Sequence, residues 1–287
     1  MAIAPSTDLT QTRSDPHGDA QTPGGPVRPA SASPEARADA TRWLLTTPVV
    51  RRLERSQPVL LLDGTLMRRA AGAVAATCAR LLAGRPRGAP VIVLAGPGNN
   101  GADALLAGLM LHRSGWPVHA LTCAPPPSPA ASPSGRSAAS SALSGENLHF
   151  ATVWRQAADR DPAHAMIDDA AALEPASLAR RFDGAALIID GLFGIGLSRR
   201  LDGTAARLVE QCERARRAAG CPVVAVDVPS GLDVDRGSAA DGAVDSPVVQ
   251  ATHTVTMIAD KPGLHTGRGR QCAGEVIVAD LQVSTPD

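Results

Sequence analysis

Short apolar runs recur along this chain from residue 91, and most of them lead into a turn rich in glycine or proline. Each run is mostly β-branched and too short for a helix, which is typical of strands buried on both faces. The predicted strands are residues 91–95, 118–122, 186–190, 223–227, 253–257 and 275–280. Segments of helical period lie before and between them, and the first places Leu66, Ala70, Val74 and Cys78 on one face. The predicted helices are residues 66–82, 103–114, 154–158, 175–181 and 204–219.

This alternation of strands and helices predicts the α/β class. Strands separated by helical segments pair in parallel, and right-handed crossovers place the helices on both faces of the sheet. We therefore expect a mostly parallel sheet covered by helices on each side.

Two segments differ in composition from this pattern. Residues 1–42 are rich in Pro, Gly, Ser and Asp and contain few large apolar side chains. Such a segment cannot offset its ordering entropy, so we predict a disordered N-terminal tail. Residues 124–146 are rich in Pro, Ser and Ala and follow a predicted strand, so we interpret them as an insertion in a loop. Residues 43–283 are then expected to form a single domain.

Charge and cysteine content narrow the functional classes. The formal net charge is +0, which gives no bulk attraction to nucleic acid or to a membrane surface. No apolar run reaches the roughly 20 residues that span a bilayer, and the N-terminus lacks the layout of a signal peptide. The five cysteines are scattered without a CxxC pair. We therefore expect reduced thiols and a cytoplasmic protein.

The turn at residues 96–101 reads Gly-Pro-Gly-Asn-Asn-Gly and fits the pattern G-x-G-x-x-G between a strand and a helix. Glycines let the backbone approach an anion, and a helix N-terminus attracts phosphate. The alternative is a turn that only lets the strand and the helix pack. An NAD-binding dehydrogenase also needs an acidic residue at the end of the next strand, where residues 121–125 contain none. A nicotinamide-dependent oxidoreductase therefore stays only as a third hypothesis.

Two carboxylates follow later strands. Asp190 precedes a glycine-rich turn that ends in Arg199 and Arg200, groups suited to phosphate. Alternatively Asp190 is a turn or capping residue, and the arginines are a solvated surface pair. Asp227 precedes Val-Pro-Ser-Gly, in which Ser230 offers a hydroxyl.

The carboxyl ends of parallel strands meet at one edge of the sheet, so these groups are expected to gather there. A carboxyl at such a rim can have a raised pKa suited to acid–base catalysis, or it can be held ionised by a cation. The two carboxylates, Asn100 and Ser230 together form a set of oxygen ligands without histidine or cysteine. Such a set suits K⁺, Mg²⁺ or Ca²⁺ rather than zinc. Lys261 is the only lysine of the sequence, and it is either a phosphate-binding group or an ordinary surface lysine.

Four ordered motifs together carry a family resemblance. The segments GPGNNGAD, DGLFGIGLSRRLDG, VVAVDVPSGLDVDRG and TVTMIADKPGL resemble those of NAD(P)H-hydrate epimerases, the N-terminal module of the bacterial nicotinamide-nucleotide repair protein. The resemblance covers residues 47 to 281, apart from the Pro/Ser-rich insertion. It implies a Rossmann-like three-layer α/β/α sandwich, often dimeric, that interconverts the R and S forms of hydrated NADH and NADPH. It also implies a functional link to a separate NAD(P)H-hydrate dehydratase.

The resemblance further implies roles for individual residues. Potassium would be held by Asn100, Asp190 and Ser230, and Asp227 is our candidate for the catalytic acid–base. The substrate would be bound by Asn99, Asn100, Gly101, Ala102, Asp103, Gly194, Ile195, Gly196, Leu197, Ser198, Arg199, Arg200 and Asp227.

One departure from the family pattern concerns the first turn. Ala102 and Ala104 stand where the family has glycine, and Ala102 would be strained if its φ were positive. The competing hypothesis from a different class is a catalytically silent module of this fold that binds a nucleotide or a protein.

Overall fold

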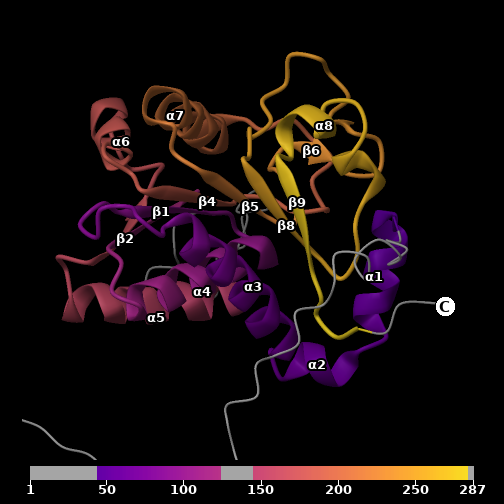
Figure 1. The fold of residues 1–287 in the computed structure, drawn as a ribbon, viewed down its shortest axis with the longest axis horizontal. Helices are drawn as coiled ribbons and strands as arrows, with labels where there is room; N and C mark the ends of the chain where they lie inside the picture. Colours follow the sequence, from indigo (N-terminus) through magenta and orange to yellow (C-terminus); the bar gives the residue numbers. More distant parts are fainter. Residues whose placement is uncertain (1–43, 124–144, 284–287) are drawn as a thin grey trace, which may run out of the picture. The chain divides into compact units, whose positions relative to one another are not determined.

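The computed structural model describes residues 44–123 and 145–283. Seven strands form one sheet in the order β3-β2-β1-β4-β5-β8-β9, and every neighbouring pair is parallel (Figure 1). Their bounds are β1 Val91–Ala95, β2 Val118–Thr122, β3 Ala165–Asp169, β4 Leu187–Gly191, β5 Val223–Val226, β8 His253–Met257 and β9 Glu275–Ala279. A short antiparallel pair, β6 Leu232–Asp233 and β7 Ser238–Ala239, lies outside this sheet. The predicted α/β class with a mostly parallel sheet is confirmed.

The helices of the described residues cover both faces of the sheet. Helices α3, α4 and α5 lie on one face and α6 and α7 on the other, which gives the three layers of a Rossmann-like sandwich (Figure 1). The helices are α1 Thr47–Arg55, α2 Pro58–Leu62, α3 Thr65–Leu81, α4 Asn99–Arg113, α5 Gly145–Arg160, α6 Pro175–Arg181, α7 Gly203–Ala219 and α8 Gly269–Cys272, with a 3₁₀ turn at Pro262–Leu264. None of them is long and apolar enough to cross a bilayer.

Alternation along each strand divides the core between the two faces. In β1, Val91 and Val93 contact the cluster under α3 and α4, whereas Ile92 and Leu94 contact the cluster under α6 and α7. All five residues of β1 are buried, as expected for a central strand with helices on both sides.

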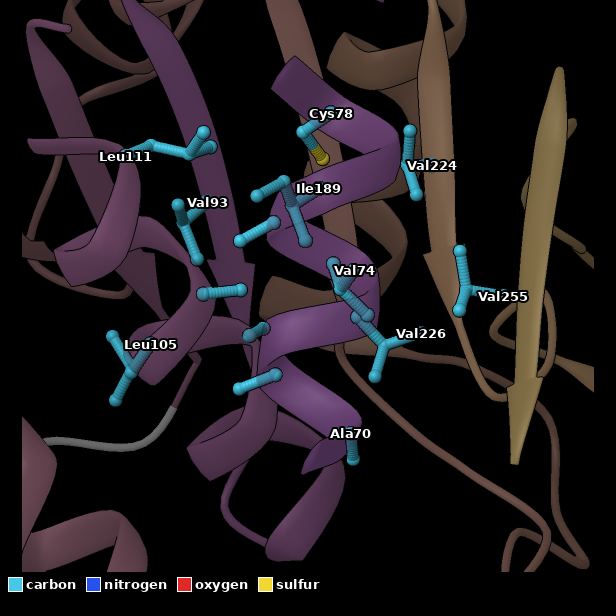
Figure 2. Close-up of a cluster of buried hydrophobic side chains, with 14 of the residues drawn as sticks. Ala70, Val74, Cys78, Val93, Leu105, Leu111, Ile189, Val224, Val226 and Val255 are labelled. Atoms are coloured by element: carbon cyan, nitrogen blue, oxygen red, sulfur yellow. The ribbon is translucent and has the colours of Figure 1, made fainter. Parts of the chain in front are cut away.

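Helix α3 packs directly on the sheet with the face that its periodicity predicted. Ala70, Val74 and Cys78 belong to one buried cluster with Val224 and Val226 of β5, and Val74 points toward Val226 (Figure 2). None of these five side chains exceeds 3% exposure. Burial of this kind stabilises the fold by roughly 25 cal/mol per Å² of apolar surface removed from water.

Several elements differ from the sequence predictions. Helix α4 begins at Asn99 rather than at residue 103, so the two asparagines belong to its first turn. Helix α5 is longer than the predicted residues 154–158, and β3, α1, α2 and the β6–β7 pair were not predicted. The predicted disordered tail, residues 1–42, lies outside the described residues, and so do residues 124–144 of the predicted insertion.

Candidate active site

The order of the strands defines a crevice between β1 and β4. From β1 the chain proceeds to β2 and β3 on one side, whereas β4 leads to β5 on the other. Ligands of open α/β sheets bind beyond the carboxyl ends of the strands at such a switch point. A cavity of about 540 Å³ lies there, lined by the turn after β1 and by the turn after β4. The crevice expected from the sequence motifs is therefore present.

The two turns are pressed together at glycines. The backbone N–H of Gly96 donates to the carbonyl of Gly191 at 3.1 Å. A Cβ added to Gly96 would lie 1.6 Å from the carbonyl oxygen of Leu192, and one added to Gly191 would lie 2.3 Å from the Cβ of Ala104. Glycine is thus required at both positions by close backbone approach rather than by a positive φ.

The first turn of α4 forms one wall of the cavity. Asn99, Asn100 and Asp103 line it, whereas Gly101 and Ala102 are buried behind them. Gly98 is the N-cap and also lines the cavity, so the positive end of this 15-residue helix lies at it. Ala102 is helical and its φ is not positive, so the strain considered for it does not arise.

The second turn contributes backbone and apolar surface. Among the residues that the resemblance pointed to, Gly194, Ile195, Gly196 and Leu197 line the cavity, whereas Ser198, Arg199 and Arg200 do not. Arg199 lines an adjoining hollow of about 150 Å³ at the N-terminus of α7 and pairs with Asp202. Arg200 pairs with Asp245, and both arginine side chains are at least half exposed.

Asp190 lies at the carboxyl end of β4 with no exposed surface. Its carboxylate accepts hydrogen bonds from the hydroxyl of Ser230 at 2.7 Å and from the backbone N–H of Ser230 at 2.8 Å. A weaker bond of 3.3 Å comes from the N–H of Leu192. Burial raises the pKa of Asp190 to about 6, although these hydrogen bonds oppose the increase.

Asn100 lies close to the turn that follows Asp190 and β4. Its side-chain oxygen is 3.4 Å from the position that a Cβ of Gly194 would occupy. Its amide nitrogen is buried and has no hydrogen-bond partner among the described residues. A buried amide without a partner is costly, so this group is suited to a ligand.

Asp227 follows β5 directly and has a φ of 65°, a left-handed conformation that is uncommon outside glycine. Its Oδ1 accepts from the ammonium of Lys261 at 2.8 Å and from the backbone N–H of Met257 at 3.0 Å. A third, longer bond of 3.3 Å comes from the hydroxyl of Thr256. All the side-chain hydrogen bonds that Asp227 makes to described residues therefore end on Oδ1, and Oδ2 is available to a ligand.

Lys261 is completely buried. Besides Asp227, its ammonium donates to the hydroxyl of Thr256 at 2.6 Å and to the carbonyls of Met257 and Ala259 at 3.2 and 3.3 Å. The interpretation as an ordinary surface lysine is therefore wrong. Lys261 does not line the cavity, so its role is to pair with Asp227 from within the protein.

Helix α1 supplies two cavity residues, Arg51 and Glu54, that sequence reasoning missed. The backbone N–H and hydroxyl of Thr47 donate to Asp235 at 2.7 and 3.1 Å, which fixes the start of the helix. Val50 is 1% exposed and anchors the helix in the core. The family resemblance includes this stretch, RRLERSQ, but it gave neither residue a role, and charged side chains on a short helix do not reveal which of them face a cavity.

Comparison with known proteins finds relatives in sequence and in fold. The family model for the YjeF-related protein N-terminus matches residues 63–263. A protein of Clavibacter sepedonicus named NAD(P)H-hydrate epimerase is 40% identical over 228 residues, covering 78% of this chain and 84% of the relative. A protein of Limosilactobacillus fermentum with the same name is 36% identical, with 68% and 76% covered. The crystal structure of yeast ynu0 (YNL200c) is similar in fold, with a TM-score of 0.59 at 19% identity over 80% of this chain and 86% of that one.

Proposed function

The chain belongs to the family of the YjeF-related protein N-terminus, and we propose that it is an isomerase that interconverts the R and S epimers of hydrated NADH and NADPH. Relatives that bear the name NAD(P)H-hydrate epimerase support this activity. One structural observation carries it: a single cavity combines the N-terminus of α4, which suits phosphate, with the carboxylate of Asp227.

The chemistry of the substrate matches this combination. The hydroxyl of the hydrated nicotinamide ring sits on a hemiaminal carbon, next to the ring nitrogen. Inverting that carbon requires a carbon–oxygen or carbon–nitrogen bond to open and close again, with proton transfer at each stage. Asp227 has Oδ1 occupied by Lys261 and Met257, so its Oδ2 is the atom positioned to exchange a proton with the substrate.

The dinucleotide would lie between the two turns. The first turn of α4, with Asn99, Asn100 and Asp103, would hold its phosphate and ribose groups. The stretch from Gly194 to Leu197 would lie against the ring. Arg199 belongs to the same turn and lines the adjoining hollow, where it would bind a second anionic group of the substrate. Positioning of this kind lowers the barrier by removing translational and rotational freedom beforehand.

We also propose a bound potassium ion held by Asn100, Asp190 and Ser230. The donor set fits: Asp190 is fully buried, and burial rather than a nearby basic group dominates its pKa. A monovalent cation would balance the negative charge of Asp190, and the side-chain oxygens of Asn100 and Ser230 would coordinate it. Its contribution would be to neutralise this carboxylate and to hold the two turns in register.

The cellular setting follows from the same proposal. An enzyme that only interconverts epimers needs a partner reaction that consumes one of them, so we expect a functional link to a separate NAD(P)H-hydrate dehydratase. We further expect a cytoplasmic homodimer. The five cysteines are free thiols, and four of them are buried, which is compatible with a reducing compartment.

The test is an assay of epimer interconversion that starts from each pure epimer of hydrated NADH. We expect wild-type protein to bring either epimer to the equilibrium mixture, and Asp227→Asn to be slower by about 10²-fold or more. If wild-type protein bound the nucleotide without accelerating interconversion, the silent binding module would be the correct reading.

A further inference from the structure

A second carboxyl group, that of Glu54, lines the cavity that contains Asp227. It arrives on α1, whereas Asp227 follows the end of β5, so the two groups reach the cavity from different elements. They are near enough to interact, because the charge of Asp227 contributes to raising the pKa of Glu54. The second carboxyl is therefore part of the same chemical site.

The surroundings of Glu54 raise its pKa above the usual value. Burial is the main cause that raises its pKa, followed by the charge of Asp227. The cations Lys261, Arg51 and Arg55 oppose this without reversing it. Asp103 of α4 also lines the cavity and adds a further acidic group.

Asp227 is placed differently, because it shares Oδ1 with a buried ammonium 2.8 Å away. Two carboxyl groups that line one cavity, only one of them paired with an ammonium, can act as an acid–base pair. An epimerisation needs such a pair, since one face of the ring loses oxygen while the other face gains it.

We propose that Glu54 is a second proton-transfer residue of this site, serving one face of the nicotinamide ring while Asp227 serves the other. This inference rests on the proposed epimerase function. It assigns a catalytic role to α1, a helix that lies within the resemblance but received no site residue from the sequence.

The proposed reaction conserves protons and electrons. Protonated Glu54 gives its proton to the ring hydroxyl, the carbon–oxygen bond breaks with its electron pair on oxygen, and water departs. The lone pair of the ring nitrogen forms a carbon–nitrogen double bond, which leaves a cationic ring. Water then adds to the other face, and its surplus proton passes to Asp227. The opposite epimer starts from the form in which Asp227 holds the proton and Glu54 is ionised.

The charges of the cavity support a cationic intermediate. Its ionisable lining consists of the three acidic residues Glu54, Asp103 and Asp227 and one basic residue, Arg51. Once Glu54 has given up its proton, its carboxylate lies in the same cavity as the positive ring and stabilises it electrostatically. This favours loss and return of water over a route through a neutral opened ring.

The deciding experiment replaces Glu54 by the isosteric amide in Glu54→Gln. We expect kcat to fall by about 100-fold or more from either pure epimer of hydrated NADH, with KM changed by less than about threefold. The limb of the kcat–pH profile that requires a protonated acid should also disappear. Arg52→Gln is the matched control, because Arg52 is exposed on the same helix and does not line the cavity; it should keep wild-type kinetics.

A shorter acid gives an independent check of the role. Glu54→Asp keeps a carboxyl group on α1 and should exceed Glu54→Gln in kcat by about tenfold or more. If wild-type protein interconverts the epimers and Glu54→Gln retains its rate and pH profile, or Glu54→Asp is no faster than Glu54→Gln, the inference is overturned while the proposed function stands. If wild-type protein itself is inactive, both proposals fall.

Discussion

The pair formed by Lys261 and Asp227 makes a quantitative prediction about stability. The variant Lys261→Met keeps most of the apolar stem and removes the ammonium group, so little cavity volume is created. Lys261 is 0% exposed and the side chain of Asp227 only 14%, so the remaining carboxylate would be left nearly buried without its cation. Removing one member of a buried ion pair costs about 3–5 kcal/mol. We expect about 3 kcal/mol, because Asp227 retains the hydrogen bond from the N–H of Met257.

The assay is chemical unfolding at pH 7 in constant KCl, performed on both single variants and on the double variant. Asp227→Asn removes the unpaired charge, so the double variant should recover about 2 kcal/mol relative to the sum of the single effects. A loss below about 1 kcal/mol for Lys261→Met, or single effects that add within about 0.5 kcal/mol, would refute the assignment of a coupled buried pair.

Three further predictions concern other parts of the site. The pKa of Asp190 is raised from its usual value of 3.8 to about 6, so the native state holds the extra proton, and this contribution to stability is present below pH 3.8 and lost as pH rises to about 6. In potassium-free buffer the free energy of unfolding should fall by about 3 kcal/mol over this pH range, and KCl should reduce the fall. The fall should be absent in Asp190→Asn, and a variant with the wild-type pH profile would contradict this. Gly96→Ala should cost about 3 kcal/mol of stability or prevent folding, because its Cβ would lie 1.6 Å from the carbonyl oxygen of Leu192. Gly98→Ala is the control: its Cβ would have no atom within 4 Å, so thermal unfolding should be nearly unchanged. Asp235→Ala removes the acceptors that fix the start of α1, so faster amide exchange in α1 and a lower kcat/KM are expected, and wild-type values for both would argue against the docking role.

Hydrophobic periodicity predicted the central strands and the long helices because their burial is complete. Val91 to Ala95 are all buried, and so are the residues of β4 and β5, so each run stands out as a continuous apolar segment. The edge strand β3 has only one fully buried residue and ends in two aspartates, so the same criterion could not detect it. The start of α4 was predicted too late because glycine and asparagine are poor helix formers. Residues 99–101 are helical because the preceding turn places them at the helix N-terminus.

The sequence placed Asp190, Asp227, Asn100 and Ser230 at one edge of the sheet, since residues that follow parallel strands must gather there. It could not show that Lys261 is buried, because that depends on how the turn after β8 folds back onto Asp227. A charged side chain is expected to be exposed unless it is paired, and the sequence alone does not reveal the pairing.

The attachment of α1 has a consequence for the order in which the protein is completed during synthesis. Thr47 leaves the ribosome early, but its partner Asp235 follows 188 residues later. Contacts of such long range form late, so Val50 must stay exposed to solvent or to chaperones until residue 235 has emerged. A nascent chain can therefore assemble the central strands before the wall that carries Glu54 is attached, and the reactive hollow is completed only after Asp235 has been synthesised.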